Sequence, residues 1–487
     1  MHKIKIIVFL VLIAILAVSA IQYRYSFVRE SLLKGYYSQP APPDLKYFTW
    51  KRWFSKNFQN DFMTRMNDNT GFRNTLIRIK NQYDYSFFKV VHAKGFLTGR
   101  NRFLFEEDYI HEYTGKYFIG TKVIDEKLSR LKNVMDSLSF YHIPLILVFE
   151  PGKASFYPEY IPERFHPEKR TLTNYEYFLR RSEDLGLSYL DLNRYFLQMR
   201  DTAHFPLFPR YGMHWSLYGV HLAANELSRY IGKVSGKSMP EFKTAYLQHT
   251  HDSPGTDYDI GELCNLIFPM KPSPGVYPVV AFDSMPAGTM PALIVADSYY
   301  VNMVESYGQK MFGRQDYWYY NGSLYPHQNE TPQVRVDKSG LREKLKQYDV
   351  ILLMVSEINL HCCFWDFADE AYRAFHPGMN DSKLDSIENK IRIDREWFRF
   401  MVKKSKEENR PLDQVIRSNA EYAFIASFND LQGKNYRDSI QYFILNIRNN
   451  EEWLELITKN AREQNMPLDS AIMLNAVYSY SQSKKNQ

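Results

Sequence analysis

Short apolar runs alternate with segments of helical periodicity through the middle of the chain. The runs of strand length are 143–149, 189–192, 292–296 and 350–355. Apolar residues recur at helical spacing over 128–138, 175–179 and 217–231. Uniformly apolar strands that alternate with amphipathic helices are typical of a parallel sheet covered by helices on both faces. The pattern therefore predicts an α/β domain over residues 91–375, which opens with a short hairpin over 95–105.

The amino terminus carries a hydrophobic segment of another kind. Lys3 and Lys5 precede a charge-free run over residues 6–21. Such a run enters a membrane, and the positive-inside rule places the chain after residue 22 outside the cytoplasm. The run is short for a spanning helix, and Val18-Ser19-Ala20 resembles a signal-peptidase site. Residues 1–25 are therefore expected to be an inner-membrane anchor, which we favour, or a cleaved signal peptide of a secreted, periplasmic-side protein.

Residues 26–90 separate this segment from the predicted domain. They are polar and aromatic, and Pro40, Pro42 and Pro43 mark a linker. A helical stretch that ends near Val91 follows. The segment is expected to form a stalk next to the membrane and a helical entry to the domain.

The carboxyl-terminal region, residues 380–487, is charged, helical in pattern and internally repeated. Glu396-Trp397 recurs as Glu452-Trp453, and Pro411-Leu412-Asp413 recurs as Pro467-Leu468-Asp469, at one constant offset. A gapless match of this kind indicates a duplicated unit, most simply two helices joined at the turn where Pro begins the second helix. The repeated tryptophans are expected to pack within each unit.

Composition excludes several classes of protein. Hydrophobic residues make up 45% of the 487-residue chain and charged residues 24%, and the 37 Tyr and 33 Phe exclude a mainly disordered chain. The net charge of +6 is spread along the chain, which does not favour nucleic acid as a partner. Three cysteines cannot build a disulfide framework, and no Cys-x-x-Cys or glycine-rich phosphate loop is present. We therefore expect no metal and no cofactor.

Polar residues stand where the predicted strands end. In open parallel sheets, sites form outside the carboxyl ends of the strands. The residues there are Glu150, Asp191, Asp297, Ser298 and Glu357. The loop before the helix over 217–231 adds His214. A serine hydroxyl needs an adjacent base to become a nucleophile, so Ser298 and His214 are the candidate pair for acyl transfer.

These segments resemble those of the alginate O-acetylation proteins, an SGNH-hydrolase-like family. The family's Pro-x-Lys and Tyr-Pro segments match Pro151-Gly152-Lys153 and Tyr157-Pro158. Its Asp-x-His-Trp signature matches Gly212-Met213-His214-Trp215, and its nucleophile segment matches Ala296-Asp297-Ser298-Tyr299. The resemblance spans roughly residues 70 to 365. It implies an SGNH-hydrolase-like sheet sandwiched by helices and an O-acyltransferase, most simply O-acetyl, that modifies an extracytoplasmic polysaccharide through an acyl-serine intermediate.

The resemblance also implies roles for single residues and a partner. Ser298 becomes the acyl acceptor and His214 the general base. A polytopic membrane-bound O-acyltransferase would supply the acyl group. Lys153 is either a pocket residue or a strand-end charge in solvent, and Glu357 has the same two interpretations. The possible orienting or pocket residues are Asp297, Trp215, Glu150, Lys153, Asp191, Glu357 and Tyr299.

One position departs from the family pattern. Gly212 stands where the family has the Asp that holds the imidazole tautomer, and the loss of such a residue can cost about 10⁴ in turnover. Another carboxylate such as Glu150, Asp191 or Glu357 could take its place, a backbone carbonyl could orient the ring, or the domain no longer catalyses. The alternatives to a transferase are therefore a degenerate glycan-binding or scaffold protein and a carbohydrate esterase, which gives the acyl group to water.

Overall fold

The computed structural model describes most of the chain. The described residues are 2–35, 54, 56–68, 70–165, 170–250, 255–271, 275–282, 285, 288–327, 330, 332–376, 383–426, 436–463 and 466–485. The predicted linker with Pro40, Pro42 and Pro43 lies outside the described residues.

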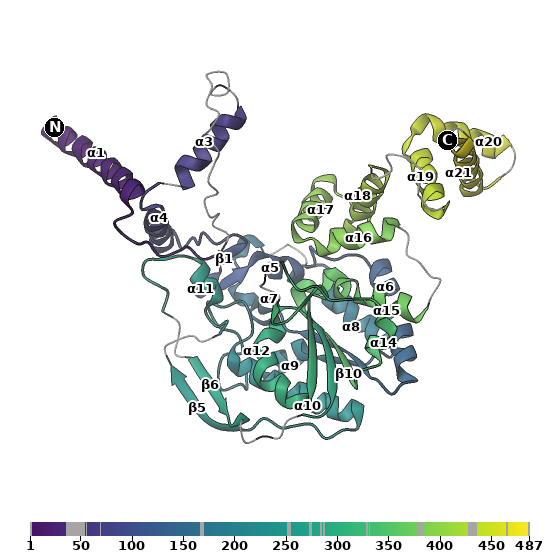
Figure 1. Ribbon diagram of the computed structural model, residues 1–487, viewed down its shortest axis with the longest axis horizontal. Coiled ribbons are helices and arrows are strands. Elements are labelled where there is room, and N and C mark those ends of the chain that lie inside the picture. Colours follow the sequence, from purple (N-terminus) through teal and green to yellow (C-terminus); the bar gives the residue numbers. More distant parts are fainter. Residues whose placement is uncertain are drawn as a thin grey trace.

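A six-stranded sheet forms the centre of the molecule (Figure 1). In spatial order its strands are β4 (Tyr189–Asp191), β3 (Leu145–Glu150), β10 (Val350–Ser356), β7 (Pro291–Ala296), β8 (Arg314–Tyr319) and β9 (Ser323–Leu324). The first five run parallel, and the short edge strand β9 pairs antiparallel with β8. The predicted α/β fold with a mostly parallel sheet is confirmed. Strands β8 and β9 were not predicted from the sequence.

Helices cover both faces of this sheet because alternate strand residues point to opposite sides. Leu145, Leu147 and Phe149 of β3 belong to one buried cluster, and Ile146 and Val148 belong to the other. The first cluster includes α6 (Thr121–Ser139), α8 (Asn174–Asp184) and α15 (Phe367–Phe375), and the second includes α9 (Leu192–Met199) and α10 (Leu217–Ser235). Both faces are therefore apolar, as the uniformly hydrophobic strands require.

Local signals fix where α8 and α10 begin and end. Thr173 and Glu176 form a capping box at the start of α8. The Ser216 side chain accepts a hydrogen bond from the Gly219 N–H at the start of α10, and Gly236 ends that helix in the left-handed conformation. The cap at Ser216 also fixes the end of the loop that carries His214.

Smaller elements surround the sheet. The predicted hairpin is present as β1 (Phe96–Thr98) and β2 (Leu104–Glu106). A second antiparallel pair, β5 (Thr244–Thr250) and β6 (Gly275–Val280), was not predicted. The short helices are α5 (Glu107–Tyr113), α7 (Lys153–Phe156), α11 (Asp259–Leu263), α12 (Val301–Met303), α13 (Gln309–Met311) and α14 (Leu341–Leu345), with 3₁₀ turns over Ser298–Tyr300 and Glu357–Asp366.

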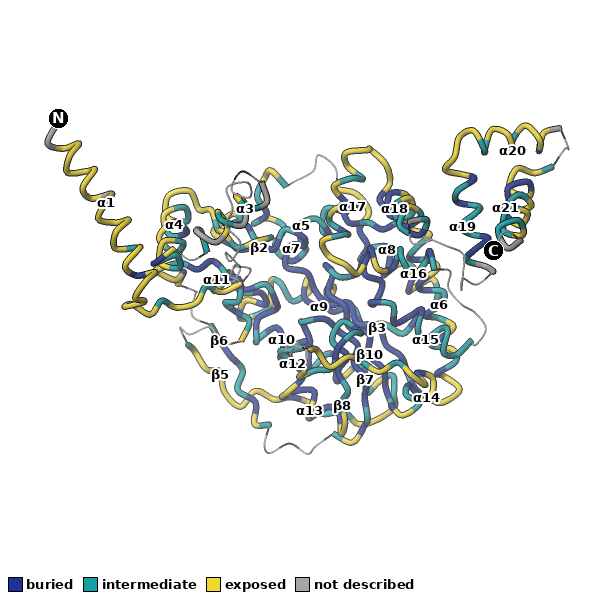
Figure 2. Tube along the Cα trace, turned by 45° about the horizontal axis from the view of Figure 1, so that its top comes forward, coloured by how far each residue is buried: buried dark blue, intermediate teal, exposed yellow. Residues whose placement is uncertain are grey.

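The amino-terminal helix α1 (His2–Tyr25) projects away from the domain and is exposed along most of its length (Figures 1 and 2). Its residues Ile4–Tyr25 are long and apolar enough to cross a membrane. The helix is consistent with either an anchor or a signal sequence. Helices α3 (Lys56–Asp68) and α4 (Arg73–Phe88) follow it.

The carboxyl-terminal region consists of two groups of three helices. The first group is α16 (Lys383–Ile393), α17 (Arg395–Glu408) and α18 (Leu412–Ala426), and the second is α19 (Tyr436–Asn449), α20 (Glu451–Glu463) and α21 (Leu468–Lys485). Each repeat thus contains the two expected helices and one more before them. Apolar residues of the first group join the core of the α/β domain. The second group has a small core of its own and contributes Leu445 of α19 to the larger core. Figure 1 shows the second group standing apart from the sheet.

Candidate active site

Ser298 and His214 lie side by side at the carboxyl end of β7. The Ser298 hydroxyl oxygen is 2.9 Å from His214 Nε2. Ser298 begins the 3₁₀ turn that follows β7, and His214 comes from the loop before α10. The structure therefore brings together two residues that are 84 positions apart in the sequence.

A third residue, Asp259, contacts the other nitrogen of the imidazole. His214 Nδ1 is 2.8 Å from Asp259 Oδ2. The second carboxylate oxygen, Oδ1, accepts the backbone N–H groups of Met213 at 2.8 Å and of Ile260 at 2.6 Å. The carboxylate is thereby fixed to the loop that carries His214. Serine, histidine and carboxylate in this order form the arrangement that activates a serine for acyl transfer.

Sequence analysis did not name Asp259, because it follows no predicted strand and sits at the start of the short helix α11. The observation that could have pointed to this segment is its pair of acidic residues, Asp257 and Asp259, shortly after the His214 loop and α10. The sequence alone does not show that the chain returns to the His214 loop after β5, so these two carboxylates could not be paired with His214.

The structure explains why residue 212 is a glycine. A Cβ atom at Gly212 would lie 2.5 Å from the Thr256 carbonyl oxygen and 2.9 Å from the Asp257 carbonyl carbon. Both neighbours are backbone atoms of the segment that leads to Asp259. The backbone that delivers the carboxylate to His214 therefore occupies the space that a side chain at position 212 would need.

Lys153 is buried and supports the same loop. Its Nζ donates to the carbonyl oxygens of Leu104 at 2.8 Å, Arg210 at 3.1 Å and Gly212 at 2.6 Å. Burial lowers the pKa of Lys153 to about 7. The solvent-exposed interpretation of Lys153 is wrong, because its side chain spans from α7 to the backbone just before His214.

Three of the other predicted residues hold the segments around Ser298 and His214 in place. Asp297 accepts the Tyr299 N–H through Oδ1, and it accepts the Ser356 N–H at 2.9 Å and the Asn359 amide at 2.8 Å through Oδ2. Trp215 is buried and donates its indole N–H to the Tyr299 carbonyl at 3.3 Å. The Tyr299 ring lies 5.0 Å from the His214 ring. These contacts tie the Ser298 turn to β10 and to the histidine loop.

The three carboxylates considered as orienting groups make other contacts. Glu150 is fully buried beside Asp297, and burial together with the charge of Asp297 raises its pKa well above the ordinary value. Asp191 caps α9 and accepts the Tyr175 hydroxyl at 2.9 Å. Glu357 accepts the Ser155 hydroxyl, and burial raises its pKa to about 7. His214 Nδ1 pairs instead with Asp259.

Tyr320 adds a hydroxyl group that sequence analysis did not assign to the site. It follows β8, the neighbour of β7, and its hydroxyl interacts with the Ser298 side chain. Tyr320 has a φ of 49°, in the left-handed region that a bulky residue rarely adopts. The backbone at the end of β8 thus holds an unusual conformation where it meets the nucleophile.

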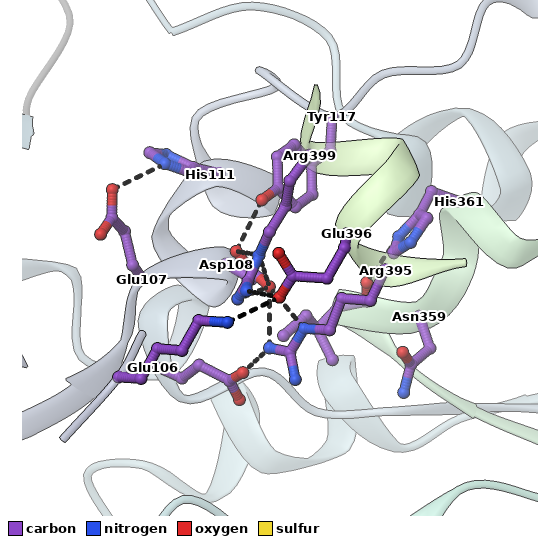
Figure 3. A network of polar contacts seen from close by, with 12 residues as sticks. Glu106, Glu107, Asp108, His111, Tyr117, Asn359, His361, Arg395, Glu396 and Arg399 are labelled. Carbon is purple, nitrogen blue, oxygen red and sulfur yellow. Dashed lines mark hydrogen bonds and ion pairs between the residues drawn. The ribbon is translucent and has the colours of Figure 1, made fainter. Parts of the chain in front are cut away.

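A charged network joins helix α17 to the domain beside this site (Figure 3). Asp108 of α5 is buried and accepts the Tyr117 hydroxyl at 2.6 Å, Arg395 Nη2 at 2.7 Å and Arg399 Nη2 at 2.7 Å. Glu106 also pairs with Arg395. The next residue along α5, Tyr109, shares a hydrogen bond of 3.0 Å with the Tyr299 hydroxyl. Helix α17 is therefore connected through α5 to the residue after Ser298.

A cavity of about 270 Å³ lies next to this network. It is lined by residues of the amino-terminal segments, of the β1–β2 hairpin, of α17, and by Met213 and Leu263. Met213 adjoins His214 in the sequence, so the cavity borders the loop that carries His214. The walls thus come from five parts of the chain that are distant in sequence.

Part of the chain matches the model of a known family. Residues 96–270 match the family described as "SGNH hydrolase-like domain, acetyltransferase AlgX". That segment contains His214 and Asp259, and Ser298 lies beyond it. No curated protein sequence matches.

Several solved structures are similar to the chain. The O-acetyltransferase domain of Pseudomonas putida AlgJ is 19% identical, with 64% of this chain and 99% of that chain covered and a TM-score of 0.38. Pseudomonas aeruginosa AlgX is 15% identical, with 61% and 70% covered and a TM-score of 0.38. Bacillus cereus PatB1, solved with a sulfonyl adduct, is 12% identical, with 54% and 97% covered and a TM-score of 0.35. The family match over residues 96–270 confirms the resemblance found in the sequence to the SGNH hydrolase-like acetyltransferases.

Proposed function

We propose that this protein is an O-acyltransferase, most simply an O-acetyltransferase, that modifies hydroxyl groups of an extracytoplasmic polysaccharide. The observation that carries the proposal is the continuous line of contacts from Ser298 Oγ to His214 Nε2 and from His214 Nδ1 to Asp259 Oδ2. The family of residues 96–270 supports the same class of reaction.

The first half-reaction would load the serine. Asp259 holds the proton of His214 on Nδ1, which leaves Nε2 free to accept the proton of the Ser298 hydroxyl. Ser298 Oγ then attacks the acyl carbonyl carbon, the bond from that carbon to the donor breaks, and His214 returns the proton to the departing group. The product is an ester between the acyl group and Ser298.

The second half-reaction reverses these roles. His214 accepts the proton of an acceptor hydroxyl, the acceptor oxygen attacks the acyl-serine carbonyl, and Ser298 leaves with the proton. If water took the acceptor's place, the same residues would make an esterase. The distinction between the two outcomes therefore rests on the acceptor and not on the three side chains.

The negative charge that develops on the carbonyl oxygen needs hydrogen-bond donors. We propose the hydroxyl of Tyr320 as the side-chain donor, since it interacts with the Ser298 side chain. A preorganised donor of this kind is worth about 10² to 10³ in rate. We assign Tyr320 this role together with the backbone N–H of the nucleophile.

The setting of the reaction follows from the chain's first helix. We propose that α1 anchors the protein to the inner membrane with the α/β domain on the periplasmic side. A polytopic membrane-bound O-acyltransferase would then deliver the acyl group close to the domain. The proposed divisions are the anchor over residues 1–25, the stalk over 26–90, the catalytic domain over 91–375 and the helical repeats over 380–487.

The proposal is tested with the full chain in detergent, using p-nitrophenyl acetate as donor and intact mass as readout. We expect an acetylated species that is absent from Ser298→Ala and His214→Ala. Addition of oligosaccharides should then convert donor turnover from acetate release to acetyl-sugar formation. Acetate release alone with every acceptor would favour the esterase, and a wild type as inert as Ser298→Ala would contradict catalysis by this chain.

A further inference from the structure

Helix α4 presents an apolar stripe to solvent. Its residues Leu76, Ile79, Tyr83 and Phe87 follow one another at intervals of three or four, which places them on one face of the helix. All four are exposed, from 43% at Leu76 to 71% at Phe87, whereas Asn81 on the other side of the helix is buried. A surface helix of a globular protein normally turns its apolar residues to the core. Helix α4 thus has an apolar face that the α/β domain does not cover.

The loop after α11 extends this stripe. Ile267 and Phe268 are exposed there, Phe268 by 73%. The backbone N–H of Phe268 donates to Gln82 Oε1 of α4 at 2.9 Å, so the loop is fastened to the helix. A contiguous exposed apolar patch marks a surface that contacts a partner or a membrane. We call this surface the α4 patch, and it consists of Leu76, Ile79, Tyr83, Phe87, Ile267 and Phe268.

The α4 patch adjoins the end of α1. The backbone at Gly71, just before α4, packs so closely on Ser19 of α1 that an added Cβ atom would overlap it. Arg78 of α4 donates to the carbonyl oxygens of Ser31 at 3.0 Å and Leu32 at 2.8 Å, which ties the segment after α1 to the helix. Figures 1 and 2 both show α4 at the inner end of α1. The patch therefore lies where α1 would leave a bilayer.

The charges around the patch fit a lipid surface. Residues 73–94 contain five basic residues and one acidic residue. Lys80 and Lys89 among them are exposed, and long lysine side chains keep their charge in the headgroup region while their stems cover apolar surface. A helix with an aromatic and aliphatic face and flanking lysines is typical of segments that lie in the plane of a membrane interface. Continuity with α1 favours lipid over a second protein, because α1 keeps a bilayer within reach.

We propose that the α4 patch is a second membrane contact, which lies in the headgroup region of the bilayer that α1 enters and holds the α/β domain against the bilayer surface. The contact rests on the proposed anchoring by α1, and it does not rest on the proposed chemistry of Ser298.

The contact is connected to the candidate site through α11. Asn81 of α4 donates its side-chain amide to the Cys264 carbonyl oxygen at 3.0 Å, directly after α11. Helix α11 is five residues long and begins with Asp259, which contacts His214. A domain held by the α4 patch therefore keeps its candidate site close to the bilayer, where an acyl group carried across the membrane would emerge.

The test measures how close the α4 patch lies to lipid. The full chain is reconstituted without any other protein in vesicles of phosphatidylethanolamine and phosphatidylglycerol, with one fluorophore on one introduced cysteine. The three native cysteines are buried and do not compete for the label. The labelled variants are Phe87→Cys and Phe268→Cys in the patch, Leu10→Cys in α1, and Phe140→Cys, at a position that is 84% exposed just after α6.

We expect lipids with a nitroxide at the headgroup end of the acyl chain to quench the labels at 87 and 268 about twofold, because interfacial helices insert their apolar face to about this depth. The label at 140 should keep its fluorescence. The label at 10 should be quenched most by a nitroxide at the methyl end. Glutamates at two patch positions, Ile79→Glu with Phe87→Glu, should reduce the quenching at 268 to the level at 140, whereas Phe140→Glu with Phe400→Glu, two exposed positions outside the patch, should leave it unchanged.

Three results would overturn the contact. The first is quenching at 87 and 268 no greater than at 140 while the label at 10 is quenched, which would leave the patch to a protein partner. The second is full quenching at 268 in the variant with both patch glutamates. The third is a label at 10 that lipid does not quench, which would remove the anchor as well. Turnover of p-nitrophenyl acetate in the same vesicles reports on Ser298 separately, so a failure of the contact is distinguished from a failure of the proposed chemistry.

Discussion

Asp259 Oδ2 lies 2.8 Å from His214 Nδ1, although the two residues are 45 positions apart and no motif links them. Gly212 stands where the family pattern has an Asp two residues before the histidine. In this chain a different segment supplies a carboxylate to the same imidazole nitrogen, and its backbone fills the space beside Gly212. The departure at position 212 and the carboxylate at position 259 are thus two parts of one arrangement.

Replacement of Asp259 by asparagine should nearly abolish turnover. The amide keeps the shape of the side chain, but it lets the imidazole adopt the tautomer that cannot accept the Ser298 proton. We expect kcat for p-nitrophenyl acetate to fall by about 10⁴, with little change in the thermal midpoint. The control is Glu262→Gln on the same helix α11, whose side chain is 50% exposed and should be silent. Retention of most of the activity by Asp259→Asn would remove Asp259 from the mechanism.

A side chain at position 212 should destabilise the domain and should not replace Asp259. The Cβ atom of Gly212→Ala would press on the backbone at Thr256 and Asp257, and overpacking of this kind costs about 1 to 3 kcal/mol. We expect a lower thermal midpoint by circular dichroism. Gly212→Asp in the Asp259→Asn background should recover no activity, because the new carboxylate has no room to reach His214.

The control for this prediction is Gly322→Ala. The nearest atom to its added Cβ is the Tyr320 carbonyl oxygen at 3.5 Å, an ordinary contact. The thermal midpoint of Gly322→Ala should match the wild type. Recovery of turnover by the double variant with Asp at position 212 and Asn at position 259 would show that the segment around Thr256 moves aside.

The sequence predicted the parts of the fold that strong periodicity determines. Strands β3, β7 and β10 are uniformly apolar because helices cover both of their faces, so they stood out as short hydrophobic runs. Strand β8 did not, because Arg314, Gln315 and Asp316 occupy its first half. Its second half is aromatic, and Tyr317 and Trp318 are buried in the sheet.

The candidate site likewise contains residues that the sequence predicted and residues that it did not. Ser298 and His214 lie in segments that a known family pattern marks, and the structure places them in contact. Asp259 and Asp257 follow no strand that was predicted from the sequence, and their positions depend on how the chain returns from β5 to the histidine loop. Such tertiary placement leaves no local signal, so carboxylates at strand ends were considered in their place.

Lys153 should make stability depend on pH in a defined window. Burial lowers its pKa from 10.5 to about 7 in the folded protein. Between these values the unfolded chain binds the proton and the folded protein does not, so the free energy of unfolding rises with pH from about 7 to about 10.5. Below pH 7 both states are protonated, and the full cost of burying the charge is present.

The measurement compares the wild type with Lys153→Met, in which this titration is absent. The difference in thermal midpoint, wild type minus variant, should become more positive from pH 7 to pH 9.5, since all other titrating groups are common to both proteins. A difference that stays constant over this range would mean that Lys153 keeps its ordinary pKa despite its three carbonyl contacts. Lys346→Met provides the control, because that lysine is 22% exposed and pairs with Glu343 on the same helical turn, whereas Lys153 is fully buried.

Loss of the Asp108 carboxylate should loosen helix α17 from the domain. Asp108 is 4% exposed and binds both Arg395 and Arg399, so Asp108→Asn leaves two guanidinium groups near a neutral amide. Removal of one partner from a buried ion pair costs about 3 to 5 kcal/mol, and the partial exposure of both arginines reduces that cost here. We expect faster hydrogen exchange in α17 and a smaller fall in turnover, since Tyr109 links α5 to Tyr299.

The comparison that isolates the effect is Glu396→Gln on the same helix. Glu396 pairs with Lys94 at 3.0 Å, but both side chains are mostly exposed, and an exposed pair contributes about 0 to 1 kcal/mol. Exchange in α17 should therefore be close to that of the wild type in Glu396→Gln and clearly faster in Asp108→Asn. Equal exchange in the two variants would mean that apolar packing of α17, centred on the Phe398 ring stacked 4.1 Å from His361, holds the helix without help from the buried carboxylate.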